Sequence, residues 1–150
     1  MKLIPRTRDE VRATLEVLPP EVRAQFSPHW LALMDKSTPQ DPWVHGFHVV
    51  DDTGATVGLG AFKGPPVDGV VEIAYAIEPD QQGKGHATAA ARALAEFAFA
   101  SGQVRVVCAH TLPDGIASQR VLLKSGFEKI GEVVDPEDGL VWRFEMAEPN

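Results

Sequence analysis

Cysteine is almost absent from this chain. Cys108 is the single cysteine among 150 residues, so no disulfide can form within the chain, and one thiol fits a reducing compartment. Apolar runs are short as well. None approaches the roughly 20 residues that a membrane-spanning helix needs, and the first residues carry no long apolar segment of the kind found in secretory signals. We therefore expect a cytoplasmic protein that does not enter a membrane.

Basic residues are in the minority. Lys and Arg number 14 against 21 Asp and Glu, which gives a formal net charge of −7. A general nucleic-acid binder needs a basic face to neutralise phosphates, so the charge argues against that class. An acidic surface would favour the approach of a cationic substrate such as an amine, although many acidic proteins carry their charge only for solubility.

The known patterns for metals and nucleotides are missing too. The five histidines and one cysteine show no zinc spacing, and we expect no metal. No Walker A loop occurs. A dinucleotide fingerprint is also lacking, because Gly83 and Gly85 are followed by Thr88 where a third glycine belongs. Any phosphate site in this chain is therefore of another kind.

Apolar periodicity and turn residues predict one α/β domain over residues 1–150. The length and the hydrophobic fraction of 44% suffice for one buried core. The patterns predict the order α-α-β-β-β-α-β-α-β-β. Helices are expected over residues 8–18, 20–36 with a break at Pro28, 86–100, and from 113–115 to 126. Strands are expected over residues 44–50, 55–62, 70–77, 104–109, 127–134 and 140–146.

A turn with two glycines joins the strand over residues 70–77 to the longest helix. Its sequence is Gln82-Gly83-Lys84-Gly85-His86-Ala87. Glycine at such a junction lets the backbone approach a ligand and turn its N–H groups toward it. The helix behind adds unpaired N–H groups and the positive end of its dipole. The junction is therefore suited to an anion, and the alternative is a tight turn that happens to use two glycines.

Glu72 stands among small side chains on one face of the strand over residues 70–77. Period-two alternation puts Glu72, Ala74 and Ala76 together, while the bulky core face holds Val71, Ile73, Tyr75 and Ile77. The alanines leave room for a ligand beside a carboxylate that could take a proton from an ammonium group, directly or through water. The alternative is a solvated sheet residue.

Two stretches together resemble the GNAT N-acetyltransferases. Gln82, Gly85 and Ala87 match the Gln-x-x-Gly-x-Ala acyl-CoA-binding motif of that family. Residues 109–122, followed by Lys124-Ser125-Gly126-Phe127, are similar to the C-terminal motif of its RimJ/RimL-like branch, which acetylates protein N-termini. The resemblance covers about residues 43–146, and the helical pair at about 8–36 is compatible with it. It implies a central mixed, mostly antiparallel twisted sheet flanked by helices.

The resemblance also implies roles for particular residues. The acyl-CoA would lie along the strand at Ala76 and Ile77, with its thioester paired to the backbone there. Its pyrophosphate would sit on the amides of Gln82, Gly83, Lys84, Gly85, His86 and Ala87. Glu72 matches the strand glutamate that often serves as general base. Ser118 matches the serine of the RimJ/RimL-like branch, where it would contact the cofactor and donate a proton to the leaving thiolate.

The sequence departs from the family at two positions. Leu122 stands where many members have a tyrosine, and Gly115 stands where relatives commonly carry an asparagine. Tyr75, the one tyrosine, is expected on the strand face opposite Glu72. The proton donor is therefore Ser118 in this interpretation, although a hydroxyl near a helix N-terminus can instead bond to free N–H groups of that helix.

Five other side chains have weaker cases. His110 closes its strand and either faces the thioester cleft or plays no part. His48 is expected to be a satisfied core or surface histidine, and Cys108 a buried small hydrophobe. Trp30 and Trp43 are expected in the core, although the loop that contains Trp43 lies where this family builds its acceptor site.

The sequence therefore predicts an N-acetyltransferase that moves an acetyl group from acetyl-CoA to a primary amine by direct attack. The acceptor is a protein N-terminus or a small-molecule amine, and the protein is a monomer or a homodimer. A different acyl chain such as succinyl would call for a cationic pocket residue that the pattern does not identify. The alternative function is a catalytically silent domain that binds acyl-CoA as a sensor.

Overall fold

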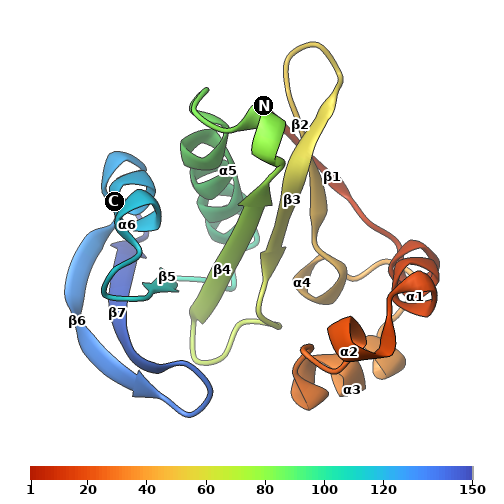
Figure 1. Cartoon of the computed structure of the whole chain (residues 1–150). Coiled ribbons are helices and arrows are strands. Elements are labelled where there is room, and N and C mark those ends of the chain that lie inside the picture. The colour runs from red at the N-terminus through yellow and green to blue at the C-terminus, as the bar shows by residue number, and fades with distance from the viewer. Residues whose placement is uncertain (150) are drawn as a thin grey trace.

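The computed structural model describes residues 1–149 as one twisted seven-stranded sheet with helices on both faces (Figure 1). The strands are β1 (Lys2–Pro5), β2 (Phe47–Val50), β3 (Thr56–Phe62), β4 (Val70–Ile77), β5 (Val106–Thr111), β6 (Glu128–Asp135) and β7 (Gly139–Ala147). The helices are α1 (Arg8–Val17), α2 (Pro20–Arg23), α3 (Pro28–Lys36), α4 (Pro42–His45), the 3₁₀ helix η1 (Pro79–Gln81), α5 (His86–Ala100) and α6 (Ile116–Lys124).

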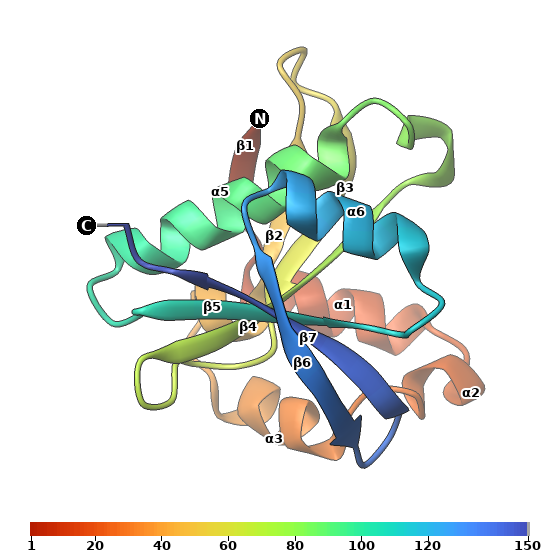
Figure 2. The same cartoon turned by 90° about the vertical axis from the view of Figure 1, so that its left-hand side faces the viewer.

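The sheet has the strand order β1-β2-β3-β4-β5-β7-β6. Every neighbouring pair is antiparallel except β4 and β5, which run parallel. That parallel pair is short, because the two strands are matched only from Val70 to Glu72, opposite Val106 to Cys108. Beyond Glu72 the strands part, and Figure 2 shows them running at an angle to each other. The sheet therefore opens in its middle.

Helix α5 lies close to the sheet because its inner face is made of small side chains. Its fully buried residues are Ala90, Ala91, Leu94, Ala95 and Ala98. Opposite them, β3 carries Gly60, where an added Cβ would come within 3.2 Å of Leu94. Four buried phenylalanines fill the rest of the main core, Phe47, Phe62, Phe127 and Phe144. This close packing fixes α5 beside β4, and with it the turn that precedes the helix.

The predicted fold class is confirmed, and two predicted elements have the observed bounds, β4 and α5. The predicted strand over residues 44–50 begins instead at Phe47. Residues 42–45 form α4, because Pro42 suits the first turn of a helix and the Asp41 carboxylate accepts the Trp43 N–H at 3.2 Å. Gly46, with φ of 72°, then turns the chain into β2.

Other elements differ from the prediction. The N-terminal strand β1 was not expected, because four residues that include a proline show no alternation, and proline is tolerated there only on a sheet edge. The break predicted at Pro28 in the helical segment over residues 20–36 is confirmed, since α2 ends at Arg23 and α3 begins at Pro28, with Ser27 capping α3 through the Trp30 N–H. The strand expected over 104–109 runs from Val106 to Thr111.

We expect Gly58→Ala to destabilise the fold by about 2 kcal/mol or more. A Cβ at Gly58 would overlap the backbone carbonyl oxygen of Ala76 on β4, and two paired strands cannot move apart without losing their ladder. Gly131→Ala is the matched control, because a Cβ there meets nothing within 4 Å. Urea denaturation measures both, and equal stability of the two variants would contradict the packing argument.

Candidate active site

Three connected hollows follow the opening in the sheet. A groove of about 650 Å³ runs between β4, the first turn of α5 and one side of α6. A cavity of about 560 Å³ lies between β3, the N-terminal helices and the β6–β7 turn. A chamber of about 150 Å³ joins them, since Tyr75 and Ser118 line both groove and chamber, while Lys63, Glu72 and Ala74 line both chamber and cavity. A molecule in the groove can thus reach a molecule in the cavity.

The glycine turn forms one end of the groove. Gly83 and Gly85 have φ of 78° and 83°, the left-handed conformation that favours glycine. Gly85 is the N-cap of α5 and supplies no side-chain acceptor, so the first N–H groups of the helix point toward the groove without a partner from a capping side chain. The Gln82 amide donates to the carbonyl of Ile77 at 3.1 Å and holds the turn against β4. This geometry suits an anion.

The groove has basic residues that the sequence interpretation did not select. Arg120 and Lys124 line it from α6, on the face that also carries Ser118. Of the predicted turn residues, Gln82, Gly83, Gly85 and Ala87 line the groove, whereas Lys84 and His86 do not. Lys84 contacts Gln81 instead, at 3.3 Å. The helical spacing of Ser118, Val121 and Lys124 was the available signal, but it becomes informative only once α6 is known to face the turn.

The open edge of β4 adds backbone groups to the groove. The Lys63 N–H donates to the Glu72 carbonyl at 2.9 Å, so Glu72 turns its backbone toward the β3 side. The register of the β3–β4 pair has no shift, so alternate residues of β4 face the other way. The residues that direct N–H and C=O toward the gap are Ile73, Tyr75 and Ile77. Ala76, predicted to pair through its backbone, lines the groove with its side chain while its backbone faces β3.

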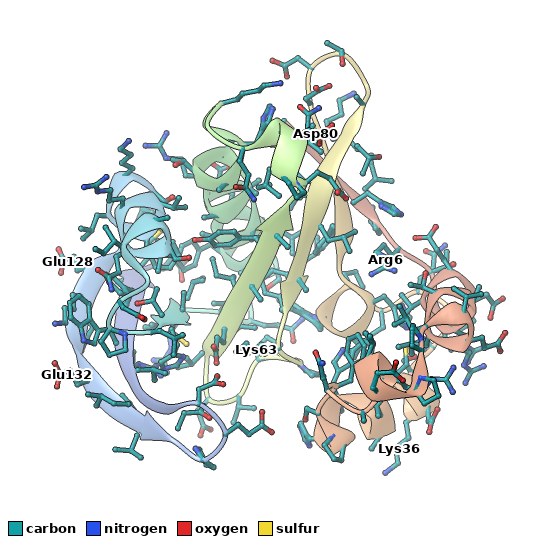
Figure 3. The ribbon with its side chains drawn as sticks, viewed as in Figure 1. Arg6, Lys36, Lys63, Asp80, Glu128 and Glu132 are labelled. Carbon is teal, nitrogen blue, oxygen red and sulfur yellow. The ribbon has the colours of Figure 1, made fainter. Side chains whose placement is uncertain are left out.

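Glu72 lies at the junction of chamber and cavity, and two partners hold its carboxylate. Its Oε2 is 3.0 Å from the Lys63 Nζ and 2.9 Å from the His110 Nδ1. Burial alone would lower the pKa of Lys63, but Glu72, with Asp138 and Asp135, raises it above its ordinary value. His110 therefore does face the cleft. Lys63, labelled in Figure 3, was missed because it lies just beyond the end of β3, where only the pairing of its N–H with the Glu72 carbonyl reveals that it is opposite Glu72.

Three hydroxyl groups line the chamber. Ser118 is exposed in the first turn of α6 and makes no hydrogen bond with residues 1–149, so the alternative role of bonding the helix N-terminus is not observed. Burial raises the pKa of Tyr75 to about 12. Alternation along β4 places Tyr75 on the other face of the strand from Glu72. Tyr75 nevertheless lines the chamber, because the sheet is open there. The Thr111 hydroxyl is buried and has no partner among the described residues.

The cavity is walled mainly by apolar side chains. Trp30 and Phe26 stack with ring centroids 5.4 Å apart, and the Trp30 indole N–H donates to the Val44 carbonyl at 3.0 Å. On the opposite side, the β6–β7 turn contributes Asp135 and Glu137. Trp30, expected in the core, therefore lines the cavity, whereas Trp43 packs in the core against Phe62 and Phe97 as expected.

The remaining candidates have structural roles. His48 pairs with the Glu10 carboxylate at 2.7 Å on the surface, as expected. Cys108 is buried, and its burial raises the pKa of the thiol to about 11, which confirms a small hydrophobe rather than a nucleophile. Within residues 1–149, no group of three or more His, Cys, Asp or Glu side chains is placed to hold a metal ion. The described helices include none that could cross a membrane.

Comparison with known proteins decides the family. Residues 4–128 match the acetyltransferase (GNAT) domain. The chain is a GNAT acetyltransferase. Membership of this family confirms the predicted class, an acetyl-CoA-dependent N-acetyltransferase, with acetyl-CoA as co-substrate. A search of curated proteins found no significant match.

Solved GNAT structures share the fold at low sequence identity. The aminoglycoside acetyltransferase AAC(6')-Ib in complex with coenzyme A and kanamycin is 22% identical, with a TM-score of 0.72 over 98% of this chain and 94% of that one. A chimera of the spermidine N-acetyltransferase SpeG from Vibrio cholerae and hSSAT is 17% identical, with a TM-score of 0.73 over 98% and 96%. A GNAT acetyltransferase from Bacillus anthracis is 20% identical, with a TM-score of 0.62 over 77% and 71%.

The floor of the cavity contains a buried neutral histidine. His45 is 2% exposed, and its Nδ1 accepts the Asp41 N–H at 3.1 Å. The hydrogen therefore lies on Nε2, which donates to the Ser37 hydroxyl at 2.8 Å, and this hydroxyl donates to the Met34 carbonyl at 2.7 Å. Burial lowers the pKa of His45, and nearby arginines act in the same direction.

We expect His45 to make the free energy of unfolding fall as the pH drops below about 6.5, the ordinary pKa of histidine. The unfolded chain then binds a proton that the folded chain rejects, so the contribution is complete above this pH and is lost as the pH falls toward the lowered folded pKa. Denaturation of wild type and His45→Gln between pH 5 and 8 checks this. The free energy of unfolding should fall less steeply with decreasing pH in His45→Gln than in wild type. The surface control His48→Gln should fall as steeply as wild type.

Proposed function

We propose that this GNAT acetyltransferase moves the acetyl group of acetyl-CoA onto a primary amine that is bound in the cavity and deprotonated by Glu72. The continuous path from groove through chamber to cavity, with one carboxylate at the junction, carries the proposal. Residues 1–150 act as one N-acetyltransferase domain in the cytoplasm. Direct transfer between substrates bound in adjoining hollows needs no covalent enzyme intermediate.

Different parts of the groove bind different parts of acetyl-CoA. The N–H groups of the glycine turn and the start of α5 hold the pyrophosphate, and Arg120 and Lys124 add positive charge from α6. The extended arm of the co-substrate lies along the open edge of β4, where Tyr75 and Ile77 direct backbone groups toward the gap beside the side chain of Ala76. The Ile77 carbonyl already accepts the Gln82 amide. The thioester then reaches the chamber, next to Ser118.

The reaction joins the amine nitrogen to the thioester carbon while the carbon–sulfur bond breaks. Glu72 takes the proton that makes the amine a nucleophile, directly or through water. His110 and Lys63 hold the carboxylate at 2.9 Å and 3.0 Å, and an incoming ammonium competes with Lys63 for it. Backbone N–H groups of the open edge stabilise the oxyanion. Ser118, or water, donates the proton that the departing thiolate needs.

The acceptor is a primary amine, and two kinds of acceptor each have support. The resemblance of residues 109–127 to the RimJ/RimL-like branch supports a protein N-terminus. The solved structures of similar fold are of aminoglycoside and spermidine acetyltransferases, which supports a small-molecule amine. The chain works as a monomer or a homodimer in either case, because one chain supplies every wall of the path described above.

We expect Glu72→Gln to lower kcat by about 10²- to 10⁴-fold, the usual contribution of a general base, while the Kd for acetyl-CoA changes little. The amide cannot accept a proton, yet it keeps the shape of the side chain. Steady-state kinetics with an amine acceptor and calorimetry with acetyl-CoA measure the two effects. Glu78→Gln, an exposed glutamate just beyond β4, is the control. Wild-type turnover in Glu72→Gln would refute the base assignment.

We expect Gly85→Glu to abolish the binding of acetyl-CoA to an otherwise folded protein. The substitution places a carboxylate where the pyrophosphate would lie and strains a residue with φ of 83°. Gly102→Glu is the matched control, because Gly102 has φ of 76° at the opposite end of the same helix and also open space around it. Calorimetric titration with acetyl-CoA measures binding to all three proteins. If folded wild type binds no acetyl-CoA, the proposal is wrong. Binding without amine-dependent turnover would favour a silent acyl-CoA sensor.

A further inference from the structure

Most polar side chains in the cavity wall are already bonded to the protein. The Trp30 indole N–H is used by the Val44 carbonyl, and both ring nitrogens of His45 have partners. The Ser27 hydroxyl accepts the Trp30 backbone N–H at 3.4 Å. The Asp135 carboxylate accepts two backbone N–H groups of its own turn. His29 and Glu137 also line the cavity and make no side-chain hydrogen bond within residues 1–149, so a ligand rich in hydroxyl groups would replace its bonds to water mainly at these two residues.

The side of the cavity facing β3 is an aromatic surface. Phe26 is 37% exposed and stacks on Trp30, whose bonded N–H fixes the orientation of the indole ring. Leu59, 40% exposed on β3, belongs to the same cavity. A large apolar side chain stays exposed at a cost of about 25 cal/mol per Å² of surface. An apolar ligand body in the cavity would cover these three side chains and remove that cost.

Two fixed cations disfavour a second positive charge inside the cavity. Arg6 lines the inner wall between β3 and α1, and its side chain is only 14% exposed (Figure 3). Its one described side-chain contact is from Nε to the Glu10 carboxylate, at 3.4 Å. Lys63 stands at the other end, beside Glu72. Beyond Asp135 and Glu137, a ligand with several ammonium groups would place one of them against Arg6 or on apolar surface.

Negative charge lies instead at the rim. Glu137 is exposed on the β6–β7 turn, and Asp135 on the same turn has a pKa below its ordinary value because two backbone N–H groups bond to it. Both carboxylates face the cavity. They attract a cation to the mouth without offering a buried partner for it. Among the residues that line the chamber, Glu72 supplies the one carboxylate, which accounts for a single ammonium group.

We propose that the acceptor is a monoamine with an aromatic or branched aliphatic body, rather than a polyamine or a hydroxyl-rich amino sugar. The inference rests on the proposed acetyl transfer and specifies the substrate class for it. The ammonium group enters past Asp135 and Glu137 and loses its proton at Glu72. The body packs against Phe26, Trp30 and Leu59.

The test measures kcat/KM of the wild-type protein for several amine acceptors at saturating acetyl-CoA. The readout is the release of the free thiol of CoA. The probes are 2-phenylethylamine and 3-methylbutylamine for the proposed class, spermidine and kanamycin for the excluded ones, and a short peptide with an N-terminal serine. We expect kcat/KM for 2-phenylethylamine to exceed the values for spermidine and kanamycin by at least about tenfold. A tenfold preference for spermidine, kanamycin or the peptide would overturn the proposal.

Two variants tie the preference to the cavity. Phe26→Ala removes an exposed ring from the wall and should lower kcat/KM for 2-phenylethylamine by about tenfold, mainly through KM. Arg6→Met removes the inner cation and should reduce the difference in kcat/KM between 2-phenylethylamine and spermidine. Ile130→Ala, at an exposed apolar residue of the edge strand β6, is the matched control and should leave both values unchanged. Unchanged selectivity in both cavity variants would count against the proposal.

Acetyl-CoA calorimetry separates this inference from the proposed function. If wild type binds acetyl-CoA and acetylates spermidine, kanamycin or the peptide but none of the monoamines, the substrate class is wrong and acetyl transfer stands. If wild type is folded and binds no acetyl-CoA, the proposed function fails and the inference fails with it. Retained acetyl-CoA affinity in Phe26→Ala and Arg6→Met shows that their effects arise in the cavity.

Discussion

The parting of β4 from β5 is the feature on which the rest of the site depends. Parallel strands normally pair along their whole length because every backbone N–H and C=O needs a partner. Here the pairing ends at Glu72 and Cys108. The free edge of β4, the chamber beside it and the access from groove to cavity all follow from that one break. Glu72 is the last residue of β4 that is paired with β5, so its carboxylate lies where the gap between these two strands begins.

The break is tolerated because other packing holds the two halves of the sheet. Helix α5 covers β3 and β4 with alanines, and α6 stands over the other half, against β5 and β6. The Arg92 guanidinium of α5 donates to the Lys124 carbonyl of α6 at 2.7 Å and links the helices across the groove. This bond joins the middle of α5 to the C-terminal end of α6, beside the groove that both helices line.

Much of the fold and part of the site could be predicted from the sequence. The strand over residues 70–77 and the helix over 86–100 were found because period, length and the glycine turn agree there. Glu72 stood out because alternation isolates it among alanines. Lys63, Arg120 and Thr111 could not be predicted as neighbours of the site, since each comes near it only through sheet register or helix packing. The local pattern also misassigned residues 44–45 to a strand, where a proline and an aspartate cap favour the short helix α4 over what the apolar composition suggests.

The walls of the cavity come from distant parts of the chain. Phe26 and Trp30 precede most of the sheet, whereas Asp135 and Glu137 follow nearly all of it, about a hundred residues later. A substrate in the cavity would bridge the N-terminal helices and the C-terminal hairpin. It would act as a reversible crosslink between the two ends of the chain, so occupancy would stabilise both ends together.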